Sequence, residues 1–328
     1  MRSIAYSPDG RHIISGSDDK AIRIWNAETG TVVRQPLKGH TSSVLSIACS
    51  PDGRHIISGS DDETIRMWDA ETGTAIGEPL KGHTGSVWSV AYSRDGHHII
   101  SGSSDTTIRI WDAETRTVVG RPLRGHTSLV LSVAYSPNGR HIISASADNT
   151  IRRWDAETRM VVGQPLRGHT SSVLSVVYSP NGHHIISASA DNTIRMWDAE
   201  TGRASGKPLE GHTDAVRSVN YSPDGHHIIS GSSDYTIRMW ATKTHSVVAK
   251  PLEGCNPWVQ PAAYSPDYQS VTHNSIPVSD SVPIRPSSMG NQILPDFHAL
   301  PDPDGWVRGP EGSLIYWVPP YCRTSCFP

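Results

Sequence analysis

Residues 39–81 read GHTSSVLSIACSPDGRHIISGSDDETIRMWDAETGTAIGEPLK, and this unit of 43 residues recurs along the chain with few changes. Each complete copy opens on Gly-His and carries one tryptophan near the end of its apolar pattern. The tryptophans fall 43 residues apart without a slip, at Trp25, Trp68, Trp111, Trp154, Trp197 and Trp240. A fixed period of this length indicates an array of similar units that bury their apolar faces against one another.

One unit contains four strand signals separated by turn signals. A short strand-like run at 43–50 ends in Ser-Pro-Asp-Gly, where proline presets the backbone of a turn and glycine tolerates the left-handed conformation. The pattern then predicts a second strand at 55–58, a third at 64–68 and a fourth around Thr74 to Pro79. A lone sheet of this size would leave both faces wet, so the units must stack around an axis.

The Gly-His that begins each unit and the Trp-Asp near its end resemble the signature of WD40-repeat proteins. The likeness covers residues 1–254 in six repeats, and residues 255–328 read as a degenerate seventh. It implies an all-β fold, a WD40 β-propeller of seven blades; the alternative is six blades with the tail packed outside. Within the tail we expect a Pro- and Ser-rich loop at 266–303 and a hairpin at 305–318 that completes the seventh blade.

In the WD40 family a histidine, a serine or threonine, an aspartate and the tryptophan of one repeat form a hydrogen-bonded tetrad. The resemblance assigns this role to His40, Ser58, Asp62 and Trp68; to His83, Ser101, Asp105 and Trp111; to His126, Ser144, Asp148 and Trp154; to His169, Ser187, Asp191 and Trp197; and to His212, Ser230, Asp234 and Trp240. The first repeat keeps Ser15, Asp19 and Trp25 but has no histidine at the tetrad position.

A serine, a histidine and an aspartate could also form a hydrolytic triad. Five copies favour the structural role instead, because catalysis needs one asymmetric site in a pocket. Neighbouring histidines such as His97 and His98 point to opposite faces of a strand, which does not favour a shared metal ion. We therefore expect a protein that is not an enzyme and has no catalytic residue, no cofactor and no metal ion.

Comparison of the repeats with one another separates constant positions from variable ones. Variation gathers at three positions of the 43-residue repeat, which are called offsets below. The first is occupied by Ser43, Ser86, Leu129, Ser172 and Ala215; the second by Leu45, Trp88, Leu131, Leu174 and Arg217; and the third by Asp61, Ser104, Ala147, Ala190 and Ser233. The family resemblance places these offsets around the mouth of the central channel. Positions that pack between blades cannot vary freely, whereas positions on a rim can.

The candidate partner-binding residues are therefore Leu45, Trp88, Leu131, Leu174, Arg217, Asp61 and Leu129. Most of them would form an apolar arc with Arg217 and Asp61 at its ends. Exposed apolar patches rimmed by polar groups mark protein contacts, and tryptophan and arginine are enriched at binding hot spots. We expect a protein or peptide ligand at this mouth; the alternative is that the side chains only plug the channel.

Composition narrows the range of partners. With 29 basic and 32 acidic residues, bulk charge does not favour nucleic acid. No apolar run approaches the roughly 20 residues that span a bilayer, and residues 1–25 lack the pattern of a secretory signal. Four cysteines do not make a disulfide framework. We expect a monomeric propeller in an intracellular setting, cytoplasmic rather than nuclear, with no membrane contact.

The near-identical units, with Asp-Ala-Glu-Thr-Gly linkers and Val-Gly-x-Pro-Leu outer strands, resemble the C-terminal propellers of fungal heterokaryon-incompatibility proteins and related NACHT-type receptors. In such proteins the propeller is a recognition domain joined to a nucleotide-binding domain. The resemblance implies a sensor propeller, and the alternative is a scaffold subunit of a nuclear or cytoplasmic complex. Because residues 1–6 match the middle of an inner strand, we expect a detached propeller, a shortened family member or an incomplete gene model.

Overall fold

The computed structural model describes residues 1–248 and Pro251 in full. Beyond them it describes only the backbone of six short strands, which are β20 (Leu252–Glu253), β21 (Ala262–Tyr264), β22 (Ser270–His273), β23 (Ile276–Ser279), β24 (Trp306–Arg308) and β25 (Leu314–Trp317). In this described part the chain forms strands and turns, and it has no helix that could cross a membrane.

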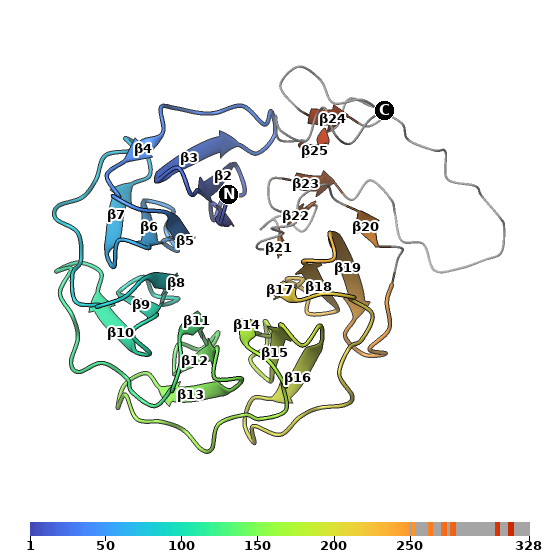
Figure 1. Cartoon of the computed structure of the whole chain (residues 1–328). Helices are drawn as coiled ribbons and strands as arrows, with labels where there is room; N and C mark the ends of the chain where they lie inside the picture. The colour runs from blue at the N-terminus through green and yellow to red at the C-terminus, as the bar shows by residue number, and fades with distance from the viewer. Residues whose placement is uncertain are drawn as a thin grey trace.

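The strands form a ring of small antiparallel sheets, or blades, around a central axis (Figure 1). The first six blades take their strands in chain order. Blade 1 contains β1 (Ser3–Tyr6), β2 (His12–Gly16), β3 (Ala21–Asn26) and β4 (Leu37–Lys38); blade 2 contains β5 (Val44–Cys49), β6 (His55–Ser60) and β7 (Ile65–Asp69); blade 3 contains β8 (Val87–Tyr92), β9 (His98–Ser103) and β10 (Ile108–Asp112). Blade 4 contains β11 (Val130–Tyr135), β12 (His141–Ser146) and β13 (Ile151–Asp155); blade 5 contains β14 (Val173–Tyr178), β15 (His184–Ser189) and β16 (Ile194–Asp198); blade 6 contains β17 (Val216–Tyr221), β18 (His227–Ser232), β19 (Thr236–Ala241) and β20. The predicted all-β propeller is confirmed.

The apolar core lies between neighbouring blades. One buried cluster joins Ile57 of blade 2 to Val87, Val90 and Trp111 of blade 3, and equivalent clusters fill the other described junctions. The first strand of each blade lies nearest the axis, as the labels β5, β8, β11, β14 and β17 show in Figure 1. Because the core is assembled from pairs of blades, each blade depends on its neighbours for stability.

The fourth strand of the repeat is much reduced in blades 2 to 5. Between residues 74 and 80 the chain touches the third strand of blade 2 only at two isolated bridges, Trp68 to Ala75 and Ile65 to Leu80. Gly77 lies between the bridges with a φ of 61°, and Pro79 has no N–H to donate. The expectation of a regular fourth strand around Thr74 to Pro79 was therefore wrong for this segment.

Serine hydroxyls connect the innermost strands from blade to blade. The backbone N–H of Val90 donates to Oγ of Ser46 in the preceding blade at 3.0 Å. The same bond recurs at four other junctions, from Ile47 to Ser3, Val133 to Ser89, Val176 to Ser132 and Val219 to Ser175. An innermost strand is the edge of its sheet, so these bonds satisfy N–H groups that the sheet cannot pair.

A further sheet, made of β21, β22 and β23, follows blade 6, and β21 lies between β17 and β1 (Figure 1). The sequence predicted loop throughout 266–303, but β22 and β23 fall inside this range, so the prediction is wrong for these strands. The remainder of 266–303 lies outside the described residues. β23 contains Pro277 and is an edge strand of this sheet, which is where a sheet tolerates proline.

The hairpin expected at 305–318 is present as the antiparallel pair β24 and β25, with Trp306 opposite Trp317. It forms a two-stranded sheet of its own, and β25 lies beside β23, the outer strand of the seventh sheet (Figure 1). That this hairpin completes the seventh blade stays a prediction.

Candidate functional site

The polar tetrad of blade 2 is assembled from two strands and two loops. His40, in the loop before β5, contacts Oδ2 of Asp62 through Nδ1 at 2.8 Å and Oγ of Ser58 through Nε2 at 2.7 Å. Nε1 of Trp68 donates to the same Ser58 Oγ at 2.8 Å. Ser58 has no exposed surface and the Trp68 ring is nearly as deeply buried. The four side chains thus form one continuous chain of hydrogen bonds beneath the surface.

The same geometry recurs in blades 3 to 6. The histidine–aspartate distances are 2.7–2.8 Å, the histidine–serine distances are all 2.8 Å and the tryptophan–serine distances are 2.8–2.9 Å. Blade 1 has no histidine at the tetrad position, and there Trp25 still donates to Ser15 while Asp19 pairs with Arg23 at 2.7 Å. Fivefold repetition of a buried, fully bonded set is what a scaffold element requires.

The direction of the bonds follows from the donors. The indole N–H of Trp68 can only donate, so Ser58 Oγ accepts from it and gives its own proton to Nε2 of His40. Nδ1–H of the neutral imidazole then donates to Asp62. In this arrangement Nδ1 of His40 donates and Nε2 accepts. A second proton on the imidazole would occupy Nε2 and remove the acceptor of the Ser58 hydroxyl.

The electrostatics of the tetrad agree with a neutral histidine beside an ionised aspartate. Burial by itself raises the pKa of Asp62, but the hydrogen bonds from His40, Thr64 and the Thr41 backbone outweigh it and hold this pKa well below its usual range. Burial lowers the pKa of His212 from its ordinary 6.5, against the opposing effect of Asp234. The pKa of Asp234 falls to about 2.

The three variable offsets lie together at one end of each blade. In blade 2 the backbone N–H of Asp61 donates to the carbonyl of Ser43 at 2.9 Å, and the equivalent bond in blade 4 joins Ala147 to Leu129. This end of the ring, where the innermost strands begin, is called the mouth below. Leu45, Trp88, Leu131, Leu174 and Arg217, which share one offset, each lie in the innermost strand of their blade and are half-buried.

A β-bulge positions the residue at this offset in every blade from 2 to 6. The register shifts between Val44 and Ser46, so that Leu45 is the extra residue with no partner on β6. The same shift isolates Trp88, Leu131, Leu174 and Arg217 in the four following blades. Bulges redirect a side chain and interrupt pairing, so the fold presents one variable side chain per blade by the same device.

Two of the bulge residues are held by the side chain that precedes the tetrad aspartate. Nε1 of Trp88 donates to Oγ of Ser104 at 2.8 Å, and Nε of Arg217 donates to Oγ of Ser233 at 2.7 Å. In blades 4 and 5, where the bulge residue is leucine, alanine stands at the serine position. The two offsets therefore vary together, with a hydroxyl present where the bulge residue has an N–H to donate.

Asp61 differs from the other predicted mouth residues because it joins two blades. Its carboxylate accepts from Ser42 of its own blade at 3.1 Å and from Ser86 of blade 3. Its side chain is therefore part of a blade junction as well as of the mouth. Leu129, also predicted at the mouth, is half-buried, and its carbonyl accepts the bond from Ala147.

Comparison of the repeats missed a fourth variable offset, directly after the tetrad aspartate. It is occupied by Lys20, Glu63, Thr106, Asn149, Asn192 and Tyr235, all with φ between 67° and 69°. A residue other than glycine costs about 1–2 kcal/mol in this left-handed region, and Tyr235 is also 45% exposed. The signal was present in the sequence, because this offset carries five different residue types in six repeats.

One prediction follows from this backbone conformation. Replacing Thr106 with glycine is expected to raise the free energy of unfolding by roughly 0.5–1 kcal/mol, because a β-branched residue at φ 69° is strained and glycine is not. Asn192→Gly is the matched control, since asparagine tolerates this region and Asn192 also donates to the Thr213 carbonyl. Urea unfolding measures both, and a Thr106→Gly protein less stable than the wild type would contradict the prediction.

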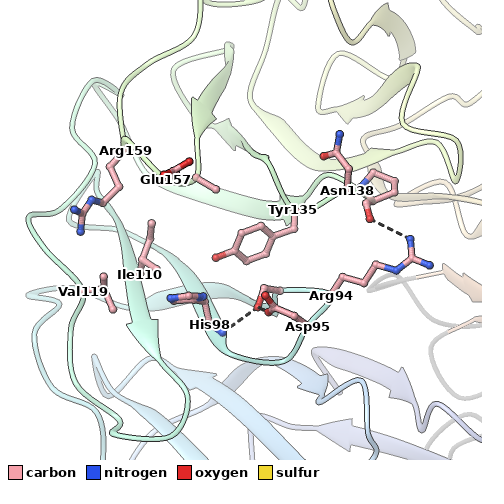
Figure 2. A pocket seen from close by; sticks show the side chains of 13 residues that line it. Arg94, Asp95, His98, Ile110, Val119, Tyr135, Asn138, Glu157 and Arg159 are labelled. Atoms are coloured by element: carbon pink, nitrogen blue, oxygen red, sulfur yellow. Dashed lines mark hydrogen bonds between the residues drawn. The ribbon is translucent and has the colours of Figure 1, made fainter.

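Grooves open between neighbouring blades at the end opposite the mouth. The groove between blades 3 and 4 has a volume of about 640 Å³ and is lined by Ile110, Val119 and Tyr135, with charged groups including Arg94 and Arg159 (Figure 2). Equivalent grooves lie between blades 1 and 2 and between blades 4 and 5. Because they repeat from junction to junction, they follow from the wedge shape of the blades and do not single out one site.

The groove between blades 1 and 2 is larger, with a volume of about 950 Å³. Cys49 stands there at the position that Tyr135 and Tyr178 occupy in the other two grooves, and the smaller side chain leaves more space. Burial raises the pKa of the Cys49 thiol to about 12. The thiol therefore stays protonated near neutral pH, which does not favour a nucleophilic role.

Comparison with known protein families agrees with the repeat geometry. The family model described as WD domain, G-beta repeat, matches six segments, residues 1–26, 30–69, 74–112, 117–155, 161–198 and 204–241. Together these segments cover more than half of the chain, and each contains one tryptophan of the 43-residue series.

Proposed function

Since this chain belongs to the WD40 repeat family, whose propellers are in general non-enzymatic modules of protein interaction, we propose that it binds a protein or peptide segment over the mouth of its channel. The observation that carries the proposal is the bulge residue. Each blade from 2 to 6 directs one side chain by the same backbone device, and that side chain is among the few that differ between near-identical repeats. A scaffold alone gives no reason for variation at that point.

The chemistry of the bulge residues suits a protein ligand. Leu131 and Leu174 belong to adjacent blades and supply apolar area, while Trp88 and Arg217 are of the types that dominate binding hot spots. The bonds from Trp88 to Ser104 and from Arg217 to Ser233 hold both side chains before a ligand arrives. Such preorganisation lowers the entropy that binding would otherwise lose.

A site-specific crosslinking experiment tests the proposal. A photoreactive amino acid at position 88 is expected to crosslink to a protein partner in extracts of the source cells, and the same amino acid at position 140, on an exposed turn at the opposite end, is not. The double variant Trp88→Ala, Arg217→Ala should lose at least about tenfold in affinity for the partner so identified. Unchanged affinity in a folded double variant would favour the channel plug.

We further propose that the chain serves as the recognition propeller of an incompatibility-type protein. Support comes from the near-identity of the repeats together with divergence at the mouth offsets, the pattern of a surface that changes faster than its scaffold. A phosphate-loop motif encoded upstream of Met1 would support this role. Recovery of one stable complex of fixed composition, with no such motif upstream, would favour a scaffold subunit instead.

A further inference from the structure

Five junctions join blades 1 to 6 in series, and at each of them one basic side chain reaches from one blade to its neighbour at the outer rim of the ring. The five side chains come from three different positions of the repeat, and they are Arg34, Arg116, Arg159, Arg153 and His245, in the order of the junctions. Each of them lies over glycine backbone, at the end of the ring opposite the mouth. Such a side chain is called a rim clasp below.

Two rim clasps reach forward into the following blade. Arg34 of blade 1 donates through Nη1 to the carbonyl of Glu71 in blade 2. Arg153 of blade 4 is only 7% exposed, and its Nη1 donates to the carbonyls of Ala199 and Glu200 in blade 5, the latter at 2.8 Å. Glu71 and Glu200 hold the same offset, so two arginines from different positions use one acceptor turn.

The other three rim clasps reach back into the preceding blade. Arg116 of blade 3 donates through Nη1 to the carbonyl of Ile76 in blade 2 at 2.8 Å, and its guanidinium covers Gly77. Arg159 covers Gly120 in the same manner and, like Val119 of blade 3, lines one end of the groove (Figure 2). His245 covers Gly206, where an added Cβ would lie 2.6 Å from the imidazole Cε1.

The backbone under these three residues is unfavourable for them. Arg116, Arg159 and His245 have φ values of 59°, 63° and 54° at an offset where Gly30, Gly73 and Gly202 also have positive φ. The chain therefore departs from glycine at this offset only where the side chain forms a rim clasp, among the described repeats. Strain of about 1–2 kcal/mol persists only where surrounding contacts offset it.

At a junction two repeat positions, one from each blade, face each other, and one of them is glycine where the other supplies the rim clasp. Where Arg34 supplies the clasp, the facing residue is Gly73; where Arg116 supplies it, the residue at the Arg34 offset is Gly77. At the junction of blades 4 and 5 both positions are glycine, Gly163 and Gly202, and Arg153 enters between them from a strand. An added Cβ would lie 3.0 Å from Arg153 Nη2 at Gly163 and 3.3 Å at Gly202.

We infer that the rim clasps act as a pairing code between blades, in which each junction accepts one basic side chain from any of three positions and excludes a second. The space is small, since a side chain at Gly77 would overlap the guanidinium of Arg116. Near-identical repeats share almost all other contacts, so their apolar faces alone distinguish one neighbour poorly from another. The code sorts the five junctions into three arrangements, so it disfavours mispaired blades that would bring two clasps, or none, into one space.

A double-mutant cycle at the junction of blades 2 and 3 tests the code. Gly77→Arg alone places two arginines in one space and also puts a side chain on a backbone with a φ of 61°, so it is expected to lower the thermal midpoint by roughly 4 °C or more. Arg116→Gly alone removes the hydrogen bond to Ile76 and relieves the strained φ, so a small change is expected. The double variant Gly77→Arg, Arg116→Gly restores a single arginine to the junction and moves the left-handed side chain from residue 116 to residue 77, so it should return to within about 2 °C of the wild type.

Arg121→Gly, which removes an exposed arginine of the same outer segment, is the matched control for loss of surface charge. If Gly77→Arg does not fold, recovery of folded protein in the double variant still supports the code. A double variant as unstable as the sum of its single changes would overturn it, because the two positions would then act independently. An unperturbed Gly77→Arg protein would overturn it as well.

Discussion

Replacing Ser144 with alanine is expected to lower the free energy of unfolding by roughly 2–5 kcal/mol, because two buried polar groups lose their partner at once. Ser144 has no exposed surface; it accepts from Nε1 of Trp154 at 2.9 Å and bonds Nε2 of His126 at 2.8 Å. Each buried group left unpaired costs about 1–3 kcal/mol. Thermal or urea unfolding measures the change.

Ser205→Ala is the matched control, since Ser205 lies on the outer rim and is only half-buried. We expect it to change the free energy of unfolding by less than about 0.5 kcal/mol. Equal effects of the two substitutions would show that the tetrad contributes no more than an ordinary surface serine. Retained partner binding in a folded Ser144→Ala protein would in turn agree with a structural role for the tetrad.

Stability is expected to fall on acidification in two steps. His212 has a folded-state pKa below its unfolded value of 6.5, so the unfolded chain binds the extra proton first and stability falls as the pH drops below 6.5. The tetrad aspartates have folded-state pKa values below the ordinary value of 3.8, so their contribution is complete above that pH and is lost as the pH falls through the folded pKa, which is about 2 for Asp234. Urea midpoints measured from pH 7 to pH 2 check both steps.

The variant Asp234→Asn separates these contributions. It removes the Asp234 carboxyl group, whose pKa is held low by hydrogen bonds. The variant should be less stable than the wild type at pH 7, and its further loss of stability below pH 4 should be smaller. Glu78→Gln, which neutralises an exposed acidic residue of the outer segment, is the control. A wild-type midpoint that stays constant between pH 7 and pH 3 would contradict the proposed protonation states.

Much of the fold could be predicted because the repeat supplies internal comparisons. The period located the six blades, and the Ser-Pro-Asp-Gly turns located the first two strands of blades 1, 2 and 6 by local chemistry alone. Predictions were wrong where the repeat stops or where its backbone leaves the strand. Beyond residue 266, composition suggested loop although β22 and β23 pair there, and Gly77 interrupts the fourth strand expected around Thr74 to Pro79.

The candidate site could be predicted only in part. Comparison of repeats identified the offset of Leu45 and Trp88 because it varies, but no local pattern indicates that this residue is the extra one of a β-bulge. A bulge depends on how two strands align over their whole length. The offset of Thr106 was overlooked although it varies, since its positive φ is a property of the turn and not of the residue types.

The sequence by itself determined the number and order of the first six units and the positions that are free to differ, and its family resemblance indicated the residues that hydrogen-bond within each unit. These properties belong to a single unit, and they repeat wherever the 43-residue pattern repeats. Only the tertiary structure decided which residues meet across a junction, such as Asp61 with Ser86 or Arg116 with the Ile76 carbonyl. Such contacts join residues 25 and 40 positions apart, and they exist only because stacking around the axis brings neighbouring blades together.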